Sequence, residues 1–184
     1  MEKIKSDTRD RMKKSIGSLH DDFNTIRTGR ASASLFDKIR VDYYGEPTPL
    51  NQVATVSIPE ARLVVIQPWD KAALPEIEKA IQKSELSLNP SNDGKVIRIS
   101  IPPLTEERRK EFVKVAKNMA EQCRVAIRNV RRDANEDLKK KQKESSITED
   151  DFKKGTDEIQ KMTDEFIKEI NDLLEAKEKE IMEV

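Results

Sequence analysis

The chain is 184 residues long, which fits one ordinary domain or two small ones. Its residues are 38% charged, 35% hydrophobic and only 4% aromatic, a composition that favours long helices with charged outer faces over a sheet-rich core or a base-stacking surface. The 35 basic and 35 acidic side chains cancel, so the net charge nominates no partner. One cysteine and one histidine exclude an internal disulfide framework and a cysteine-rich zinc site.

The sequence shows no sign of membrane insertion or export. No apolar run reaches the roughly 20 residues that a membrane span needs, and the opening MEKIKSDTRDR lacks the apolar centre of a signal peptide. We therefore expect a cytoplasmic protein. The charge is unevenly spread, because residues 105–144 carry 13 basic and 8 acidic side chains whereas residues 145–184 carry 6 and 13. This asymmetry suits a polyanionic partner, although a basic and an acidic helix lying side by side would produce the same pattern.

Three segments have the apolar spacing of amphipathic helices. The first helix is predicted over about residues 2–28, with Gly29 as its C-terminal cap. The second begins after the N-cap Thr105, and the third begins near Thr148. The apolar seam of the first consists of Met12, Ile16, Leu19, Phe23 and Ile26. That of the second consists of Phe112, Ala116, Met119, Cys123, Ala126, Val130, Ala134 and Leu138. The third buries Phe152, Ile159, Met162, Phe166, Ile170, Leu173 and Ile181.

A helix with one apolar stripe is unstable alone, so three stripes predict a three-helix bundle. The middle of the chain changes to the two-residue period of strands, predicted near residues 39–44, 53–58, 63–67 and 96–101 around a short helix at 74–81. GEPTPL (45–50) and residues 89–94 are predicted to be turns. The predicted fold class is therefore mainly α with an α+β insert. The bundle domain comprises 1–30 and 105–184, and the inserted small domain comprises 31–104.

Two short crossings must join these domains, one at Gly29, Arg30 and Ala31 and the other at Pro102, Pro103 and Leu104. Paired prolines favour a stiff, extended crossing, whereas glycine allows its neighbours to bend. We interpret the crossings as a restricted hinge. Domains that pack firmly and do not move would use the same residues, and the sequence does not separate the two.

The sequence offers little to an enzyme. No glycine cluster has phosphate-loop spacing, and the carboxylate pairs lie on solvated faces, so no catalytic residue, cofactor or metal is predicted. Cys123 lies on an apolar seam and is interpreted as a buried structural thiol. His20 is interpreted as a partly exposed helical side chain. Trp69 is either a binding handle or, as we favour, a residue that closes the core of the insert.

The arginines of the second helix form the candidate site. On a helical wheel the seam spans roughly 200–280°, whereas the basic side chains lie between roughly 340° and 80° and so point away from the core. No acidic residue occurs from Arg124 to Arg132, and we expect these guanidinium groups to lack a local carboxylate partner. Planar guanidinium suits bidentate phosphate contacts. The arginine face consists of Arg124, Arg128, Arg131 and Arg132, and Arg27 and Arg30 at the end of the first helix are expected to extend it. A charged but merely solvated face is the alternative.

Four strings extend the interpretation beyond physical chemistry. They are IRTGRAS (26–32), YYGEPTPL (43–50), PPLTEERRK (102–110) and RVAIRNVRRDAN (124–135). In this order and spacing they closely resemble bacterial ribosome recycling factor, and the resemblance covers essentially the whole chain.

The resemblance implies an L-shaped, monomeric protein whose outline is similar to transfer RNA. It consists of a three-helix bundle and a small β/α/β domain on a two-stranded hinge. The family acts after termination with elongation factor G and GTP to split the ribosome into subunits, releasing mRNA and transfer RNA, and initiation factor three then keeps the small subunit free. The family's bundle binds large-subunit ribosomal RNA through basic positions that here are Arg30, Arg128, Arg131 and Arg132.

Two alternatives to this function stay open. One is a structural helical adaptor that joins protein partners, and the other, less favoured, is an enzyme. Binding to an RNA backbone weakens steeply with salt, whereas an apolar interface between helices does not.

Overall fold

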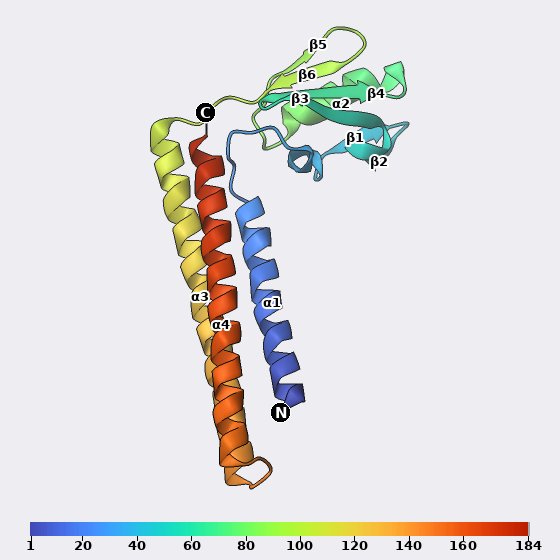
Figure 1. Cartoon of the computed structure of the whole chain (residues 1–184). Coiled ribbons are helices and arrows are strands. Elements are labelled where there is room, and N and C mark those ends of the chain that lie inside the picture. The colour runs from blue at the N-terminus through green and yellow to red at the C-terminus, as the bar shows by residue number, and fades with distance from the viewer. Residues whose placement is uncertain (184) are drawn as a thin grey trace. The chain divides into compact units, whose positions relative to one another are not determined.

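The computed structural model describes residues 1–183, in which the chain forms four α-helices (Figure 1). The helices are α1 (Glu2–Asn24), α2 (Leu74–Lys83), α3 (Glu106–Lys143) and α4 (Glu149–Met182). The strands are β1 (Arg40–Tyr43), β2 (Glu46–Pro49), β3 (Ala54–Glu60), β4 (Leu63–Pro68), β5 (Pro90–Asn92) and β6 (Ile97–Ser100). The predicted fold class, a three-helix bundle with a small α+β part, is confirmed.

The chain divides into two compact units. The bundle unit comprises Met1–Thr28 and the chain from Thr105 onward, and the small unit comprises Gly29–Leu104. The first boundary between the units therefore lies after residue 28, two residues before the boundary expected from the sequence, which was after residue 30. Within residues 1–183, no helix is long and apolar enough to cross a membrane.

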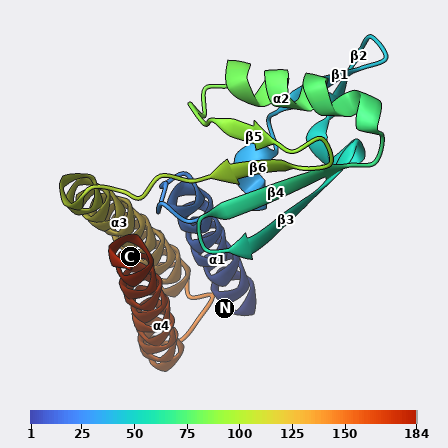
Figure 2. The same ribbon diagram turned by 90° about the horizontal axis from the view of Figure 1, so that it is seen from above.

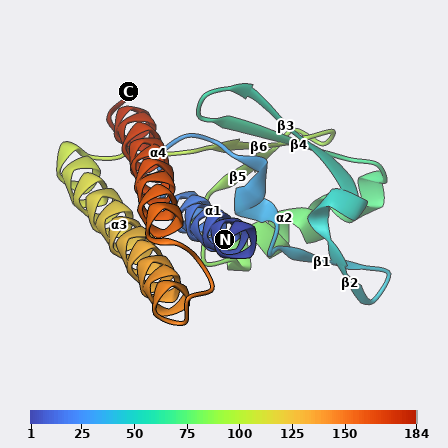
Figure 3. The ribbon, with the colours of Figure 1, turned by 60° about the horizontal axis from the view of Figure 1, so that its bottom comes forward.

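The bundle unit is built from α1, α3 and α4, which lie side by side around a shared apolar core (Figure 3). Thr105 caps α3 by accepting a hydrogen bond from the Arg108 N–H, at 3.2 Å. Thr148 caps α4 through a reciprocal capping box with Asp151. Ile127, Ile159 and Ile170 are fully buried, and burial of each such side chain contributes about 1.5–3 kcal/mol.

Two details of the predicted seams are wrong. Ala120 and Ile127 are fully buried on α3, whereas the predicted seam residues Phe112, Met119 and Ala126 are only half-buried. On α4 the buried residue is Leu174, whereas the predicted residues Leu173 and Phe152 are half-buried. The cause is that α3 packs against two helices at once, so its buried face is wider than the single stripe that a heptad-like seam describes.

Helix α1 ends at Asn24, earlier than predicted, and Gly29 does not cap it. Thr25 terminates the helix, because its hydroxyl donates a hydrogen bond to the Asp22 carbonyl oxygen at 2.6 Å and its backbone N–H bonds to the same turn. Ile26 follows outside the helix but is still buried in the bundle core.

The small unit contains a four-stranded antiparallel sheet in the order β3-β4-β6-β5 and a separate β1-β2 hairpin (Figure 2). Helix α2 shares one apolar core with the sheet and with β1 through Ile77, Ile81 and Val41. The other fully buried members of this core include Val64, Ile66, Ile97 and Ile99.

Two segments predicted as turns are strands. Residues 46–49 form β2, and residues 90–92 form β5. Both lie at an edge, where a strand has hydrogen-bonding groups that need no partner, so proline is tolerated there. Pro47 and Pro49 are two residues apart, so their backbone nitrogens lie on the same edge of β2. That edge faces away from β1 and has no neighbouring strand to bond to.

Trp69 does not close the core of the small unit, and the favoured interpretation of this residue is wrong. Its side chain is 66% exposed, and its indole N–H donates to the Thr55 hydroxyl at 2.9 Å. Branched aliphatic side chains already fill the interior. Since Thr55 belongs to the edge strand β3, the indole lies on the outside of the sheet, where it lines a cavity of about 650 Å³ together with Phe36 and Arg40.

The small-unit ends of both crossings are anchored to one turn. The Ala31 N–H donates to the Ala61 carbonyl oxygen, and the Ile101 N–H donates to the Arg62 carbonyl oxygen, each at 2.8 Å. Gly29 has a φ of 76°, in the left-handed region, and a Cβ there would lie 3.2 Å from the Leu104 Cγ atom. Backbone conformation and close approach both require glycine at this position.

We expect Gly29→Ala to destabilise the small unit, because left-handed φ alone costs a non-glycine residue about 1–2 kcal/mol. Gly45→Ala is the matched control, since Gly45 has a φ of 83° and no atom within 4 Å of an added Cβ. Denaturant unfolding followed by the fluorescence of Trp69, the one tryptophan, measures both. A smaller loss for Gly29→Ala than for Gly45→Ala would contradict the close approach to Leu104.

Cys123 is buried as predicted, and its thiol donates to the Ser15 carbonyl oxygen. Burial raises the pKa of the thiol to about 11. At pH 8 only about one thiol in a thousand is then ionised, so alkylation by iodoacetamide should be far slower in the native protein than in guanidinium chloride. Equal rates in the two conditions would contradict this burial.

The same shift has a consequence for stability. In the unfolded chain the Cys123 thiol loses its proton near pH 9, whereas in the folded protein it keeps that proton up to about pH 11. The stability that comes from burying the neutral thiol is therefore fully present below about pH 9 and is lost as the pH rises through about 11.

Candidate nucleic-acid interface

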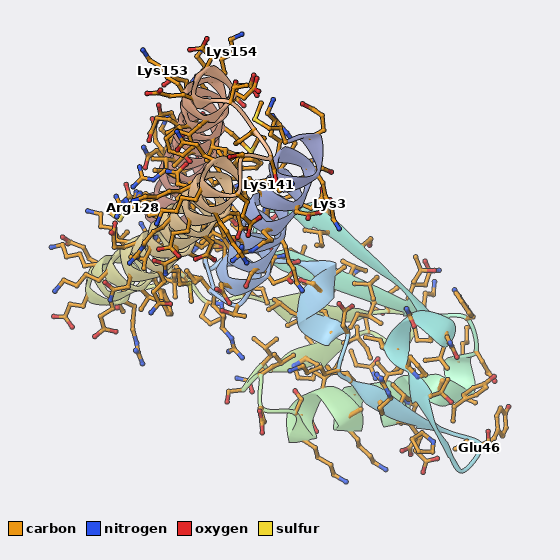
Figure 4. The ribbon with its side chains drawn as sticks, turned by 90° about the horizontal axis from the view of Figure 1, so that it is seen from below. Lys3, Glu46, Arg128, Lys141, Lys153 and Lys154 are labelled. Carbon is orange, nitrogen blue, oxygen red and sulfur yellow. The ribbon has the colours of Figure 1, made fainter. Side chains whose placement is uncertain are left out.

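Helix α3 carries the arginine face just past its middle, from Arg124 to Arg132. Arg128 and Arg132 are exposed, whereas Arg124 and Arg131 are half-buried. In Figure 4 the labelled Arg128 side chain extends outward from the bundle. The sequence prediction that all four point away from the core is therefore right for two and wrong for the other two.

The wider buried face of α3 explains this difference. Ala120 and Ile127 extend the core to roughly 300–320° on the helical wheel, next to Arg131 and Arg124 at roughly 340° and 0°. These two arginines consequently lie along the boundary with α4. Arg124 donates two hydrogen bonds to the Asn171 Oδ1 atom, at 2.8 and 3.1 Å, and Arg131 donates one to the Gln160 Oε1 atom at 3.2 Å.

The four arginines differ in how far their charge is compensated. Glu121, one turn before Arg124, accepts hydrogen bonds from Arg124 at 2.9 Å and from Arg128 at 3.2 Å. These bonds, first that from Arg124 and then that from Arg128, hold the pKa of Glu121 below its ordinary value. The expectation that the arginines lack a local carboxylate is therefore wrong for this pair, because the helix brings in an acid from before the run.

Arg131 and Arg132 keep their charge. Arg131 bonds to the amide of Gln160, and Arg132 bonds to the amide of Asn129. Neither arginine has a carboxylate within ion-pair distance among the residues that the structure describes. An amide oxygen orients a guanidinium without cancelling its charge, so these two groups stay available to an anion.

A groove of about 520 Å³ lies beside these two arginines. We call it the basic groove, and both α3 and α4 contribute to it. It is lined by Arg128, Arg131, Arg132, Asn135, Glu136, Lys139, Phe152 and Thr156. Four basic side chains face one carboxylate there, so the groove is suited to an anionic partner such as a phosphate backbone.

Arg30 does not belong to the same unit as the other arginines. Because α1 ends at Asn24, Arg30 lies beyond the helix and within Gly29–Leu104, where it is exposed.

Sequence reasoning missed the contribution of α4. Phe152, Thr156 and Gln160 follow one another at intervals of four residues and carry no charge, although residues 145–184 hold 13 acidic side chains. That uncharged row was the available signal for a face turned toward the arginines. It could not be assigned without knowing the rotation of α4 against α3.

Across residues 1–183, no group of three or more His, Cys, Asp or Glu side chains is arranged to hold a metal ion. His20 is exposed, in keeping with the sequence interpretation.

Comparison with known proteins assigns the chain to a family. A family model described as "Ribosome recycling factor" matches residues 2–182. The chain is 61% identical to a ribosome-recycling factor of Treponema denticola, over 100% of this chain and 99% of the relative. It is 62% identical to one of Syntrophomonas wolfei, over 98% of each.

Solved structures agree with these relatives. A solution structure of the ribosome recycling factor matches with a TM-score of 0.75 and 46% identity, covering 100% of this chain and 97% of that one. A second match has a TM-score of 0.64 and 49% identity over 99% of this chain and 98% of that one. It is described as models of the T. thermophilus ribosome recycling factor and the E. coli elongation factor G bound to the E. coli post-termination complex.

Proposed function

Because the chain belongs to the ribosome recycling factor family, its function is ribosome recycling, and we propose that the arginine face of α3 binds large-subunit ribosomal RNA. The protein is a translation factor and not an enzyme. The observation that carries the proposal is the uncompensated charge of Arg131 and Arg132 beside the basic groove.

The chemistry of this surface favours a phosphate backbone. Guanidinium groups make bidentate contacts to phosphate, and Arg128, Arg131 and Arg132 present three of them along the same groove. Lys139 adds an ammonium group at one end. Phosphate contacts of this kind supply most of the affinity of a nucleic-acid surface that does not read base sequence.

The surface of the bundle does not favour the alternative of a helical adaptor. Such a protein would need a continuous exposed apolar stripe. The large hydrophobic side chains that are exposed on the described part of the bundle are Val115, Val125 and Met182, and Val115 and Val125 are ten residues apart on α3. Isolated exposed side chains of this kind are normal on any surface.

The partner in the ribosome is taken from the second structural match. That chain is described together with elongation factor G on a post-termination complex. By this likeness, the present protein acts on the post-termination ribosome with elongation factor G. We further propose, from the resemblance to the family, that this action uses GTP and splits the ribosome into subunits with release of mRNA and transfer RNA. Initiation factor three acts afterwards on the free small subunit.

In this mechanism the bundle is held on RNA while elongation factor G moves the small unit. The hinge residues are Gly29, Arg30, Ala31, Pro102, Pro103 and Leu104. The backbone bonds from Ala31 and Ile101 to the turn at Ala61 and Arg62 favour a pivot outside these anchors, toward residues 28–30 and 102–105. The energy for the motion comes from GTP hydrolysis by the partner.

The direct test of the function is subunit splitting. Post-termination ribosomes are mixed with elongation factor G and GTP, with and without this protein, and light scattering follows dissociation. We expect splitting only in the complete mixture.

We expect Arg131→Ala with Arg132→Ala to leave the fold nearly unchanged, because surface substitutions of this kind alter stability by about 0.5 kcal/mol or less. The variant should bind purified large subunits weakly. Each lost phosphate contact should reduce the slope of log affinity against log salt by about 0.7–0.9. Isothermal titration at several salt concentrations measures both quantities.

Arg108→Ala is the control for this experiment, since Arg108 is on the same helix but is paired with Glu111 at 2.9 Å. Replacing Arg131 and Arg132 by lysine should preserve much of the slope but lower the affinity, because an ammonium group cannot make the bidentate contact. A folded double alanine variant with unchanged affinity and slope would show that the arginine face is only solvated.

The hinge gives a further prediction. Replacing Pro102 and Pro103 by glycine should widen the distribution of distances between labels on the two units, because proline restricts the backbone and glycine does not. Splitting should slow while the melting of the bundle stays the same. One narrow distribution before and after the change would contradict the hinge.

A further inference from the structure

Gln160 of α4 is the link between an acidic helix and the arginine face. Its side-chain amide has two partners in the structure. The Oε1 atom accepts a hydrogen bond from the Arg131 Nη1 atom at 3.2 Å, and the Nε2 atom donates one to the Asp164 Oδ1 atom at 2.9 Å. The two bonds together determine which way the amide points, because only this orientation satisfies both neighbours.

This arrangement places a carboxylate one side chain away from the guanidinium. Asp164 orients the amide of Gln160, and the amide orients Arg131, but Asp164 forms no ion pair with Arg131 among residues 1–183. The guanidinium is therefore held in place with its charge intact. A carboxylate in the place of the amide would hold it equally well and would also cancel much of its charge.

We propose that Gln160 is a positioning residue of the RNA-binding face, which holds Arg131 in the basic groove by a neutral hydrogen bond and so keeps its charge available to a phosphate. The inference rests on the proposed function. It goes beyond that function because it assigns a role to α4, the acidic helix, and because it makes the absence of charge at position 160 the important property.

The neighbouring pair on the same two helices shows the contrast. Arg124 also bonds to an amide of α4, that of Asn171, but it is in addition paired with Glu121, and its side chain is only 18% exposed. Its charge is already partly compensated by the carboxylate that it shares with Arg128, so a neutral partner at position 171 preserves less free charge than one at position 160. Equal substitutions at 160 and 171 should therefore have unequal effects on RNA binding.

The test compares Gln160→Glu with Asn171→Asp in the full-length protein. Both changes are nearly isosteric, both add one negative charge to α4, and both place it against an arginine of α3. Any general effect of making α4 more acidic is common to the two variants. The quantity measured is the affinity for purified large ribosomal subunits between about 50 and 200 mM salt, with helical content and melting temperature as controls.

We expect Gln160→Glu to reduce the slope of log affinity against log salt by about 0.7–0.9, the value of one phosphate contact. Over a fourfold change in salt this contact corresponds to about a threefold change in affinity. Asn171→Asp should leave the slope unchanged. Gln160→Glu gains an ion pair with Arg131 but loses the hydrogen bond to Asp164 and brings two carboxylates together, so we expect its melting temperature to change little.

Gln160→Met separates positioning from charge. Methionine has nearly the same length but offers no strong acceptor to Arg131, so the guanidinium is less well held while its charge remains. This variant should bind more weakly than the native protein with an unchanged salt slope. A residue with a purely structural role would lower the melting temperature in Gln160→Met and would not change the slope in Gln160→Glu.

The outcomes separate this inference from the function on which it rests. A shallow salt dependence of the native protein itself would contradict RNA binding by the arginine face. A steep native slope that Gln160→Glu leaves unchanged would overturn the role of Gln160 alone. Equal losses in Gln160→Glu and Asn171→Asp would also overturn it, because they would show a general effect of charge on α4.

Discussion

The packing of α3 against α4 is the contact on which the rest of the bundle depends. Isoleucines 127, 159 and 170 of these two helices are fully buried, and α1 completes the core. Because α3 is buried against two helices, its polar surface is narrower than a single apolar stripe would leave. The four arginines therefore cannot be equivalent. Arg128 and Arg132 extend into solvent, and Arg124 and Arg131 lie at the edge of the core against α4.

The division of the arginines has an electrostatic consequence. Arg124 and Arg128 share Glu121, whereas Arg131 and Arg132 are oriented by amides and keep their charge. The uncompensated positive charge of the arginine face is thus centred nearer to the C-terminal end of α3 than the run of basic residues alone indicates. A surface ion pair is worth little for stability, about 0–1 kcal/mol, so what these partners decide is the availability of charge and not the strength of the fold.

The two crossings between the units are anchored to the small unit at a single turn. The turn at Ala61 and Arg62 receives a backbone hydrogen bond from the residue at the small-unit end of each crossing. Gly29 completes the junction, because its φ lies in the left-handed region and an added Cβ would lie 3.2 Å from the Leu104 Cγ atom. If the units move relative to one another, as we propose, these anchors confine the motion to a few residues and leave the core of the small unit intact.

The sequence by itself determined the three helices, their caps at Thr105 and Thr148, the alternating strands and the family, because capping and periodicity are local and the motifs are specific. It also located the arginine run. The end of α1 at Asn24, the edge strands with prolines, the exposed side of Trp69 and the partners Glu121, Gln160 and Asn171 were decided only by the tertiary structure. Each of these depends on which neighbour is present in space, such as an unpaired strand edge or the rotation of α4 against α3, and periodicity in one segment carries no information about its neighbour.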